Sequence, residues 1–372
     1  MSDAASQTTH ATIVLLPGDG VGPEVVGAAR LVLDAVAARW SHSFEYRDAL
    51  IGGAAIDATG TALPPETIRL CTSSDAVILG AVGGPKWDDP AGTIRPEQGL
   101  LGIRKALGLF ANLRPVRAEP SMIHASPLKV ELLAGVDFVV VRELTGGIYF
   151  GEKTLERDEG GERATDLCVY TTAEVERVVR VACELARARK GRLTSVDKAN
   201  VLETSRLWRR VTTRVVRDEF PELVLDHLLV DSAAMRLIQA PASFDVIVTE
   251  NMFGDILTDE AAVLAGSIGL LPSASLGPVD RSRRHRMGLY EPIHGSAPTI
   301  AGQGVVNPIG TVLSAALLLR HSLGLEKEAG AIERAVHLVL ASGAGTPDIV
   351  SSWGTRVTTS ELAQAVADRL ER

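Results

Sequence analysis

Two aspartates four residues apart are the first candidates for chemistry in this sequence. Asp255 and Asp259 stand in NMFGDILTDEAA, and their spacing places both carboxylates on one face of a helix. Like charges at this spacing repel, so a shared Mg²⁺ or Mn²⁺, which prefers oxygen ligands, is one reason to keep them. Asp231, after the run LDHLLV, could supply a third ligand. A solvated helix face is the alternative interpretation of the pair.

A lysine and a tyrosine are candidates for proton transfer. Lys198 follows the apolar run LTSV in SVDKAN, and a lysine at a strand end beside carboxylates can have its pKa moved and act as a base. Tyr149 lies in TGGIYFG and is equally ambiguous, because tyrosines usually pack with the hydroxyl hydrogen-bonded. Residue type alone therefore leaves the solvated lysine and the packed tyrosine open.

Three arginines could bind carboxylates. Arg104 lies in the helical run GLLGIRKALG, Arg114 lies in FANLRP, and Arg142 ends the apolar run DFVVVRE. An unpaired buried charge is costly, and the planar guanidinium matches carboxylate geometry with two hydrogen bonds. Each arginine alone is equally well explained by a structural ion pair, and the sequence does not bring the three together.

The segment LPGDGVGPE, from Leu16 to Glu24, has the glycines of a phosphate-binding turn but not their spacing. A dinucleotide fingerprint beginning at Gly18 and Gly20 needs a third glycine where Pro23 stands. Proline fits the first turn of a helix, where its missing N–H is not needed. The sequence therefore favours a tight structural turn and argues against an ordinary Rossmann domain.

A second Gly- and Pro-rich segment is EPIHGSAPTIAGQGVVNP, from Glu291 to Pro308. Small residues and prolines over this length predict an ordered loop. Its backbone is open enough for a flat ligand or a pyrophosphate to approach closely. A surface loop without a ligand is the alternative.

The elements that must position these residues alternate between short apolar runs and amphipathic segments. Alternating strands and helices predict an α/β fold with a largely parallel sheet. Helices are predicted from Pro23 to Ala38 and from Thr172 to Arg189, and helices dominate from Gly310 onward. Strands are predicted at Thr12–Leu16, Ala76–Leu79, Phe138–Val141, Leu193–Val196, Val224–Val230 and Asp245–Thr249.

Composition excludes several classes of protein. The 372 residues are 46% hydrophobic and 23% charged, which is ordinary for a globular chain of about two domains. The 38 Lys and Arg against 46 Asp and Glu give a net charge of −8, which disfavours binding to nucleic acid or anionic membranes.

The cysteines and the N-terminus indicate a reduced, soluble, cytoplasmic protein. Cys71, Cys168 and Cys183 are widely spaced and form no CxxC pair, so we expect no disulfide framework and three cysteines that pack as small apolar residues. The start MSDAASQTTH lacks a signal peptide's features and is expected to be a frayed polar extension. No apolar stretch is long enough to span a bilayer.

Taken together and in order, the motifs closely resemble those of the 3-isopropylmalate dehydrogenases. These belong to the β-decarboxylating hydroxyacid dehydrogenases, with the isocitrate, homoisocitrate and tartrate enzymes. The resemblance runs from about residue 11 to the end of the chain. It is carried by LPGDGVGPE, GGPKWDDP, GLLGIRKALGLFANLRP, VRELTGGIYFGE, SVDKANVLE, NMFGDILTDEAA and EPIHGSAPTIAGQGVVNP.

The resemblance implies a two-domain fold with a mostly parallel sheet core that is not an ordinary Rossmann domain. The first, cofactor-side α/β domain would be discontinuous and comprise residues 1–109 and 266–372. The second, residues 110–265, would carry the dimer interface and the metal and catalytic residues. The family forms homodimers in which each subunit contributes residues to its partner's active site.

The resemblance also assigns roles to residues by position. Arg104, Arg114 and Arg142 would bind the malate carboxylates. Asp231 of the neighbouring subunit, with Asp255 and Asp259, would hold Mg²⁺ or Mn²⁺. Lys198 of the neighbour would accept, with Asp231, the proton of the C2 hydroxyl, and Tyr149 would protonate the enol carbon. The isopropyl group would meet Glu97, Leu100, Leu101 and the neighbour's Val201.

The cofactor implied by the resemblance is NAD, held through its adenosine half by the loop from His294 to Asn307. The residues concerned are His294, Gly295, Ser296, Ala297, Pro298, Thr299, Ile300 and Asn307. Members of the family that use NAD usually have an aspartate where this chain has Thr299, and a threonine replaces its contacts to the ribose only partly. Neither Thr299 nor Ile300 offers the positive charge that the 2′-phosphate of NADP would need.

The activity implied is oxidative decarboxylation of (2R,3S)-3-isopropylmalate to 2-oxoisocaproate and CO₂ in leucine biosynthesis. Leu100 and Leu101 suit an isopropyl group and would leave a third carboxylate unpaired, which favours isopropylmalate over isocitrate. The alternatives are the same chemistry on tartrate, malate or homoisocitrate, and a catalytically silent carboxylate- or metal-binding protein on the same scaffold. Glu250 departs from a glycine that is common in the family, and the sequence offers no account of it.

Overall fold

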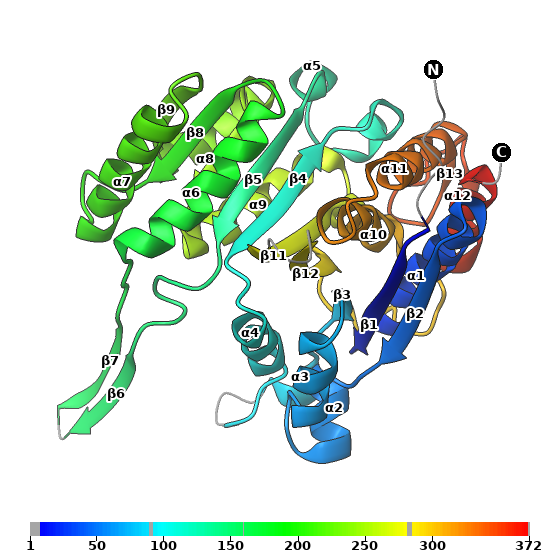
Figure 1. The fold of residues 1–372 in the computed structure, drawn as a ribbon, viewed down its shortest axis with the longest axis horizontal. Coiled ribbons are helices and arrows are strands. Elements are labelled where there is room, and N and C mark those ends of the chain that lie inside the picture. The colour runs from blue at the N-terminus through cyan, green and yellow to red at the C-terminus, as the bar shows by residue number, and fades with distance from the viewer. Residues whose placement is uncertain (1–7, 89–91, 159, 281–284, 371–372) are drawn as a thin grey trace. The chain divides into compact units, whose positions relative to one another are not determined.

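The structure is a computed structural model that describes residues 8–88, 92–158, 160–280 and 285–370 (Figure 1). The chain divides into two compact units: Met1–Leu109, Glu119–Ser126 and Ala265–Arg372 form the first, and Phe110–Ala118 and Pro127–Leu264 form the second. Residues 1–7 of the expected polar extension, and Asp89 and Pro90 of GGPKWDDP, lie outside the described residues. Within the described ranges, no helix is long and apolar enough to cross a membrane.

In the described part of the first unit, five strands pair side by side in the order β2-β1-β3-β12-β11. The neighbours are parallel except β11 and β12, which pair antiparallel. The strands are β1 (His10–Gly18), β2 (Ser43–Asp48), β3 (Ala76–Ala81), β11 (Pro272–Asp280) and β12 (His285–Pro292), with the short pair β13 (Ala344–Gly345) and β14 (Thr355–Arg356) apart from them.

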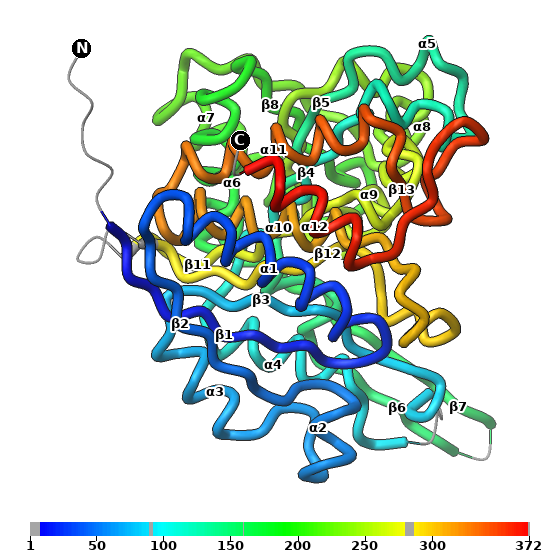
Figure 2. The backbone as a smooth tube through the Cα atoms, turned by 90° about the vertical axis from the view of Figure 1, so that its right-hand side faces the viewer, coloured from blue at the N-terminus to red at the C-terminus, as the bar shows by residue number. Residues whose placement is uncertain are grey.

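Helices from both ends of the chain pack in the first unit. They are α1 (Gly22–Trp40), α2 (Gly52–Thr59), α3 (Pro65–Thr72), α4 (Glu97–Ala106), α10 (Ile309–His321), α11 (Glu326–Ala341) and α12 (Thr359–Leu370), with 3₁₀ turns at Pro85–Trp87, Pro120–Ala125 and Ile268–Leu270. Helix α12, at the C-terminal end, runs beside α1 (Figure 2). Strand β3 is buried along its whole length, and its Val77 and Leu79 pack in one core cluster with Ile103 of α4.

In the described part of the second unit, five strands pair side by side in the order β4-β5-β10-β8-β9, so β9 is an edge strand. Only β4 and β5 pair antiparallel, and the other neighbours are parallel. The strands are β4 (Ala111–Arg117), β5 (Asp137–Glu143), β8 (Arg192–Asp197), β9 (Val224–Leu229) and β10 (Val246–Thr249). A separate antiparallel hairpin joins β6 (Lys153–Asp158) and β7 (Gly161–Asp166).

The helices of the second unit follow its strands along the chain. They are α5 (Val130–Leu133), α6 (Thr172–Arg187), α7 (Glu203–Glu219), α8 (Val230–Gln239) and α9 (Asn251–Ala265), with a 3₁₀ turn at Pro241–Ser243. Helix α6 begins at a capping box, in which Thr171 and Glu174 each bond the other's backbone N–H. The predicted end at Arg189 is two residues too late, because Arg189 leaves the helix to pair with Asp137 and Asp245.

The α/β fold class and the mostly parallel sheet predicted from the sequence are confirmed. Each of the six predicted strand runs matches a strand of the structure, although Asp245 precedes β10 and Val230 already belongs to α8. The three cysteines are free thiols, as expected; Cys71 and Cys183 are buried, whereas Cys168 is only partly buried and is less enclosed than predicted.

Candidate active site

Helix α9 carries the two aspartates that the sequence singled out. Asp255 and Asp259 are one helical turn apart, as their spacing predicted. The helix begins directly after the buried strand β10, and Glu250 at this junction accepts a hydrogen bond from the backbone N–H of Phe253 at 3.3 Å. Glu250 therefore satisfies an otherwise free amide of the first turn, which is the structural account that the sequence lacked. Burial raises the pKa of this carboxyl.

Two buried arginines reach this helix from neighbouring strands. Arg142, at the end of β5, pairs with Asp255 and donates to the Asn251 side-chain oxygen from Nε at 3.0 Å and from Nη2 at 2.7 Å. Arg114, on β4, lies 3.5 Å from the Asp255 carboxylate and 3.7 Å from that of Asp259. The structure thus brings together two of the three predicted arginines and two of the three predicted metal ligands.

Tyr149 completes this group, which we call the α9 cluster: Arg114, Arg142, Tyr149, Asp255 and Asp259. The tyrosine hydroxyl donates to Asp255 Oδ2 at 3.1 Å, and the Arg142 guanidinium lies 5.8 Å from the centre of its ring. Burial and the neighbouring Asp255 carboxylate raise the pKa of Tyr149, so the phenol stays protonated and can act as an acid.

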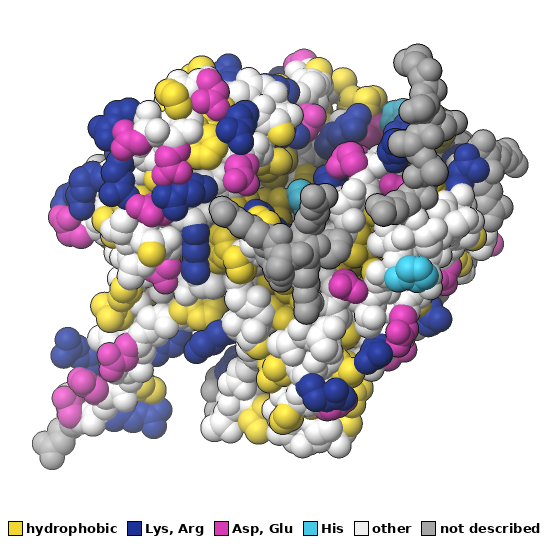
Figure 3. Space-filling model, viewed as in Figure 1, with side chains coloured by type: hydrophobic (Ala, Val, Ile, Leu, Met, Phe, Trp, Pro, Cys, Tyr) yellow, Lys and Arg dark blue, Asp and Glu magenta, His cyan; other side chains and the backbone are white. Residues whose placement is uncertain are grey.

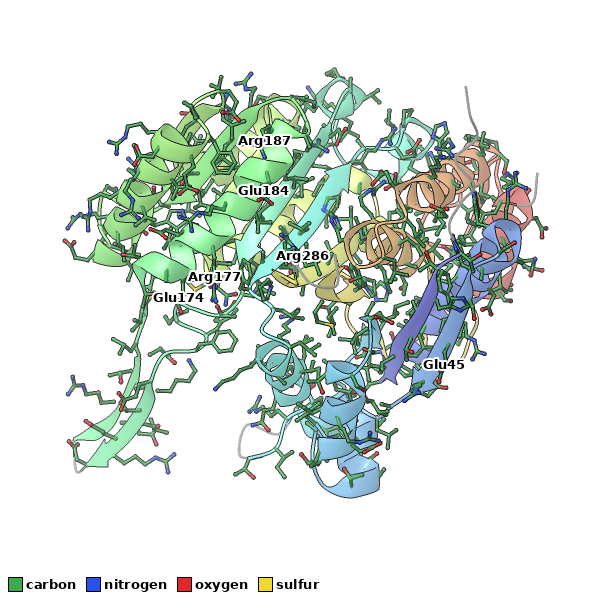
Figure 4. All side chains as sticks on the ribbon, viewed as in Figure 1. Glu45, Glu174, Arg177, Glu184, Arg187 and Arg286 are labelled. Carbon is green, nitrogen blue, oxygen red and sulfur yellow. The ribbon has the colours of Figure 1, made fainter. Side chains whose placement is uncertain are left out.

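The loop that carries Tyr149 is held by residues that the sequence reasoning missed. Glu143 is fully buried and accepts the backbone N–H groups of Thr145 and Gly146 at 2.9 and 2.7 Å. Arg177 of α6, labelled in Figure 4, contacts Thr145 and lies 3.5 Å from Glu143. A charged residue at the end of a buried strand, as in VVVRE, was the available signal for Glu143.

Lys198 and Asp231 form a second group in the same unit. Lys198 follows β8, Asp231 lies in the first turn of α8, and Nζ of the lysine donates to Oδ1 of the aspartate at 2.7 Å. This hydrogen bond lowers the pKa of the exposed Asp231 carboxyl. Within the described part of the chain, no three His, Cys, Asp or Glu side chains gather into a group that could hold a metal. One chain therefore does not bring Asp231 to Asp255 and Asp259.

In the first unit, helix α4 presents four predicted substrate-binding residues on one face. Glu97, Leu100, Leu101 and Arg104 follow the spacing of successive helical turns. Glu97 is exposed, the two leucines are partly buried, and Leu100 packs against the core cluster of the unit. Arg104 is buried and donates to Glu291 at 2.6 Å, so the predicted substrate arginine forms an internal ion pair.

The segment LPGDGVGPE forms a structural turn, as its spacing favoured. The N–H groups of Asp19, Val21 and Gly22 donate to Ala81, Ser296 and Asp19 carbonyls, so they are already bonded within the protein. A side chain at Gly20 would approach the Ser296 carbonyl oxygen to 1.9 Å, which explains the glycine. The turn therefore holds the loop that follows β12 instead of presenting these amides to a phosphate.

This loop, residues 293–308, is further fixed by Glu24 of α1. The Glu24 carboxylate accepts the backbone N–H groups of Gly302 at 2.7 Å and Gly304 at 2.9 Å. Ala297 and Ile300 pack against Val21 and Val25. The loop that was predicted from its glycines and prolines is thus irregular in structure but tied to the first unit at several points.

The predicted cofactor residues of this loop differ in what their polar atoms contact. The buried Nε2 of His294 has no hydrogen-bond partner in the described structure, and burial lowers the pKa of this ring so that it stays neutral. Thr299 is exposed. Asn307 is buried, donates to Asp348 at 3.0 Å and accepts the Ile309 N–H at 3.1 Å, so its side chain serves the loop itself.

Comparison with known proteins is consistent across sequence and structure. The family model described as isocitrate/isopropylmalate dehydrogenase matches residues 12–366. A 3-isopropylmalate dehydrogenase of Anaeromyxobacter dehalogenans is 58% identical over 359 residues, covering 96% of this chain and 100% of the relative. The 3-isopropylmalate dehydrogenase of Bacillus subtilis (strain 168) is 56% identical, with 95% and 96% covered.

Solved structures show the same architecture. The crystal structure of isocitrate dehydrogenase from Methylococcus capsulatus matches with a TM-score of 0.85 and 33% identity, covering 97% of this chain and 99% of that one. The apo crystal structure of a β-decarboxylating dehydrogenase from Thermococcus kodakarensis matches with a TM-score of 0.77 and 36% identity, covering 97% and 96%. These two structures confirm that the fold expected from the motifs extends over nearly the whole chain.

Proposed function

The chain belongs to the isocitrate/isopropylmalate dehydrogenase family, and from this premise we propose that it catalyses NAD-dependent oxidative decarboxylation of 3-isopropylmalate to 2-oxoisocaproate and CO₂ in leucine biosynthesis. The observation that carries the proposal is the α9 cluster, in which two buried arginines, two carboxylates and a protonated tyrosine converge. A cytoplasmic location stays a prediction from the sequence.

Substrate recognition is assigned to arginines and to an apolar helix face. Arg114 and Arg142 are suited to bind malate carboxylates. Their guanidinium groups already pair with a carboxylate of α9, which shows that they can donate to carboxylate oxygens at this position. Arg104 would bind the substrate by exchanging Glu291 for a substrate carboxylate. Leu100 and Leu101, one turn before Arg104 on α4, suit an isopropyl group, and the neighbour's Val201 would complete that pocket.

A divalent metal fits the chemistry of the α9 carboxylates. Asp255 and Asp259 supply hard oxygen donors, and two arginines balance their charge, so Mg²⁺ or Mn²⁺ and a dicarboxylate substrate could enter together without leaving a large net charge. Asp231 of the neighbouring subunit would be the third ligand. When bound, the metal supplies a Lewis acid for the carbonyl formed at C2. Chelation should abolish turnover, and added Mn²⁺ should restore it.

Two groups of this chain would move protons. The neighbour's Lys198, hydrogen-bonded to Asp231, would take the proton of the C2 hydroxyl as hydride leaves C2. Loss of CO₂ leaves an enol carbon, and Tyr149 would protonate it. The raised pKa of Tyr149 supports this role, because the phenol holds its proton until a stronger base forms beside it.

NAD is assigned to the loop at residues 293–308. The unpartnered Nε2 of His294, the exposed Thr299 and the open backbone at Gly295 are groups that an adenosine could contact. Ser296, Ala297, Pro298, Ile300 and Asn307 would form the surrounding wall. NAD supplies the hydride acceptor when it is bound.

A homodimer with shared active sites is supported by apolar side chains that one chain leaves exposed. Val201 is 61% exposed, Met235 on α8 is 61% exposed, and Ile256 on α9 is 59% exposed. Large exposed apolar side chains such as these are typical of a surface that a second subunit covers. The separation of the Lys198–Asp231 pair from the α9 carboxylates within one chain agrees with this arrangement.

The test of the proposed activity measures reduction of NAD and of NADP with Mn²⁺ present and 3-isopropylmalate, isocitrate, tartrate and malate in parallel. We expect turnover with 3-isopropylmalate and NAD. Preference for another acid would reject the substrate assignment at Leu100 and Leu101, and preference for NADP would reject the cofactor assignment at Thr299.

The shared site is tested by mixing two inactive variants, Lys198→Met and Asp255→Asn. A mixed dimer contains one site with both wild-type residues if the site is shared, so part of the activity should return. Mixed dimers that form and stay inactive would contradict the assignment of Lys198 to the partner's site.

A further inference from the structure

Helix α7 carries a concentration of arginines that the proposed reaction does not use. Arg206, Arg209, Arg210, Arg214 and Arg217 recur at intervals of three and four residues, so they share one face of the helix. The chain as a whole has a net charge of −8, which makes this local excess of positive charge notable. Figure 3 shows Lys and Arg side chains gathered over this part of the second unit, with carboxylates among them.

The arginine face forms one wall of a groove. The groove has a cavity volume of about 780 Å³ and is lined by the five arginines and by His227 of the edge strand β9. The described residues that line it include no aspartate or glutamate. Its volume lies within the range of small-molecule sites, roughly 300–1,000 Å³. We call this feature the α7 groove.

Several of these arginines have carboxylate partners, but most of these ion pairs are exposed to solvent and therefore weak. Arg206, Arg214 and Arg217 pair with Glu203, Glu176 and Asp218, and the arginine side chains of these pairs are 43%, 47% and 71% exposed. Ion pairs as exposed as these contribute little, so a more highly charged ligand can compete for the guanidinium groups.

Arg210 and His227 differ in how their side chains are held in the groove. The Arg210 side chain is exposed and makes no hydrogen bond or ion pair with any described residue. His227 bonds the Thr213 hydroxyl through Nε2 at 3.0 Å, while its buried Nδ1 has no partner in the described structure. Arg210 therefore offers a guanidinium without a carboxylate partner beside four further arginines, and this excess of unbalanced positive charge favours an anionic ligand.

Arg209 differs from the others because it is part of the scaffold. It donates from Nε and Nη2 to the buried Asp197 at 2.8 Å each, and Asp197 in turn accepts the backbone N–H of Ala199. Ala199 and Asn200 line one end of the groove, directly after Lys198. The groove is therefore fixed in position and extends to the residue next to the proposed catalytic lysine.

We propose that the α7 groove binds a small anion with two or more phosphoryl groups, at a site whose lining includes none of the residues assigned to the substrate or NAD. Guanidinium groups match phosphate oxygens with paired hydrogen bonds, and phosphoryl groups supply enough negative charge in a small volume to balance several arginines. A small ligand is favoured over nucleic acid because the positive groups are confined to one groove of an acidic chain.

The test titrates inorganic tripolyphosphate into the full-length protein by calorimetry, without divalent metal and at low ionic strength. Saturating 3-isopropylmalate is present in a parallel titration, so that binding at the proposed substrate arginines is recognised by its loss. The groove variant is Arg210→Gln combined with Arg217→Gln. The matched control is Arg69→Gln combined with Arg356→Gln, which removes the same charge from two exposed positions in the first unit.

We expect binding that survives 3-isopropylmalate, that weakens at least about tenfold in the groove variant, and that is unchanged in the control. Equal weakening in both variants would show a general charge effect and overturn the proposal. Absence of binding to the wild type, or loss of all binding when 3-isopropylmalate is added, would overturn it as well. Tighter binding of a single-stranded oligonucleotide with the same number of phosphates would reject the small-molecule assignment.

Discussion

The α9 cluster and the loop at residues 293–308 use charge in opposite ways. In the cluster, charged side chains face one another, and Arg142 and Arg114 both lie beside Asp255. At the loop, carboxylates bind backbone N–H groups instead. Glu24 accepts two N–H groups of the loop, and Asp19, in the turn LPGDGVGPE that contacts the loop, accepts those of Gly53, Ala54 and Gly83. In the proposed mechanism the first arrangement places charge beside the substrate, whereas the second gives a neutral chain segment a fixed shape.

The largest expected effect on activity comes from removing a charged side chain of the second unit. Lys198→Met should lower kcat by about a thousandfold, because it removes the proposed base together with the hydrogen bond to Asp231. Steady-state kinetics with 3-isopropylmalate measure the change. Lys190→Met is the control, since Lys190 is exposed and its side-chain ammonium donates to the Asp137 backbone carbonyl, away from the proposed site. Comparable kcat values in the two variants would remove Lys198 from the chemistry.

The next effect concerns a group that the first unit keeps neutral by burial. Burial, followed by the charges of Arg320 and Arg286, lowers the pKa of His321 from 6.5 to about 4. Below pH 6.5 the unfolded chain binds this proton and the folded chain does not, so stability falls as the pH drops toward 4. The loss attributable to His321 is at most about 3 kcal/mol.

Denaturant unfolding between these pH values measures the effect as the difference between the wild type and His321→Gln. The variant should lose less stability than the wild type on acidification. Parallel curves for the two proteins would contradict the lowered pKa. Glu143 and Glu250 have raised pKa values, so their contribution to the folding stability increases as the pH falls. This contribution is common to the wild type and the variant and cancels when the two free energies of unfolding are subtracted.

The scaffolding role of carboxylates at the loop is tested by Glu24→Gln. The amide oxygen can accept only one of the two loop N–H groups well, so the loop should loosen and the KM for NAD should rise about tenfold with kcat nearly unchanged. Hydrogen exchange at Gly302 and Gly304 should become faster. Glu66→Gln, which alters an exposed pair with Arg69, is the control. A fall in kcat with an unchanged KM would contradict the assignment.

The smallest expected effect comes from placing a negative charge in the loop at residues 293–308. Thr299→Asp should lower the KM for NAD by up to about tenfold, because a carboxylate can accept both ribose hydroxyls. Thr299→Ser keeps a single hydroxyl and should behave like the wild type. An unchanged or higher KM in the aspartate variant would mean that the ribose is held elsewhere.

Sequence reasoning predicted the strands that are short uninterrupted apolar runs, but it missed β4, β11 and β12, whose sequences mix apolar residues with Pro, Gly and charged residues. The apolar runs that became β3, β5 and β10 are almost wholly buried, so their strand character is visible without tertiary information. Strand β2 and the hairpin β6–β7 were missed because SFEYRD and LERD are polar and largely exposed. Their strand pairing depends on neighbours and not on local apolarity.

The candidate site shows the same division. Residue types and helical spacing were enough to single out Asp255, Asp259 and Lys198. Sequence alone could not reveal that Asn251 binds Arg142, or that Glu143 holds the loop before Tyr149, because these contacts join residues far apart in the chain. Glu250 had no account in the sequence, because a capping role requires knowledge of where α9 begins.

The order in which the strands of the first unit occur along the chain has a consequence for its synthesis. Strand β3 is complete by residue 81, but its neighbour β12 begins only at His285. During translation, the uninterrupted apolar strand AVILGA therefore has a free edge while the whole second unit emerges and can fold. Such an edge is a template for unwanted strand pairing between nascent chains. The first unit thus depends on late-arriving residues to protect an early strand, and truncation before β12 should yield aggregates in place of a stable fragment.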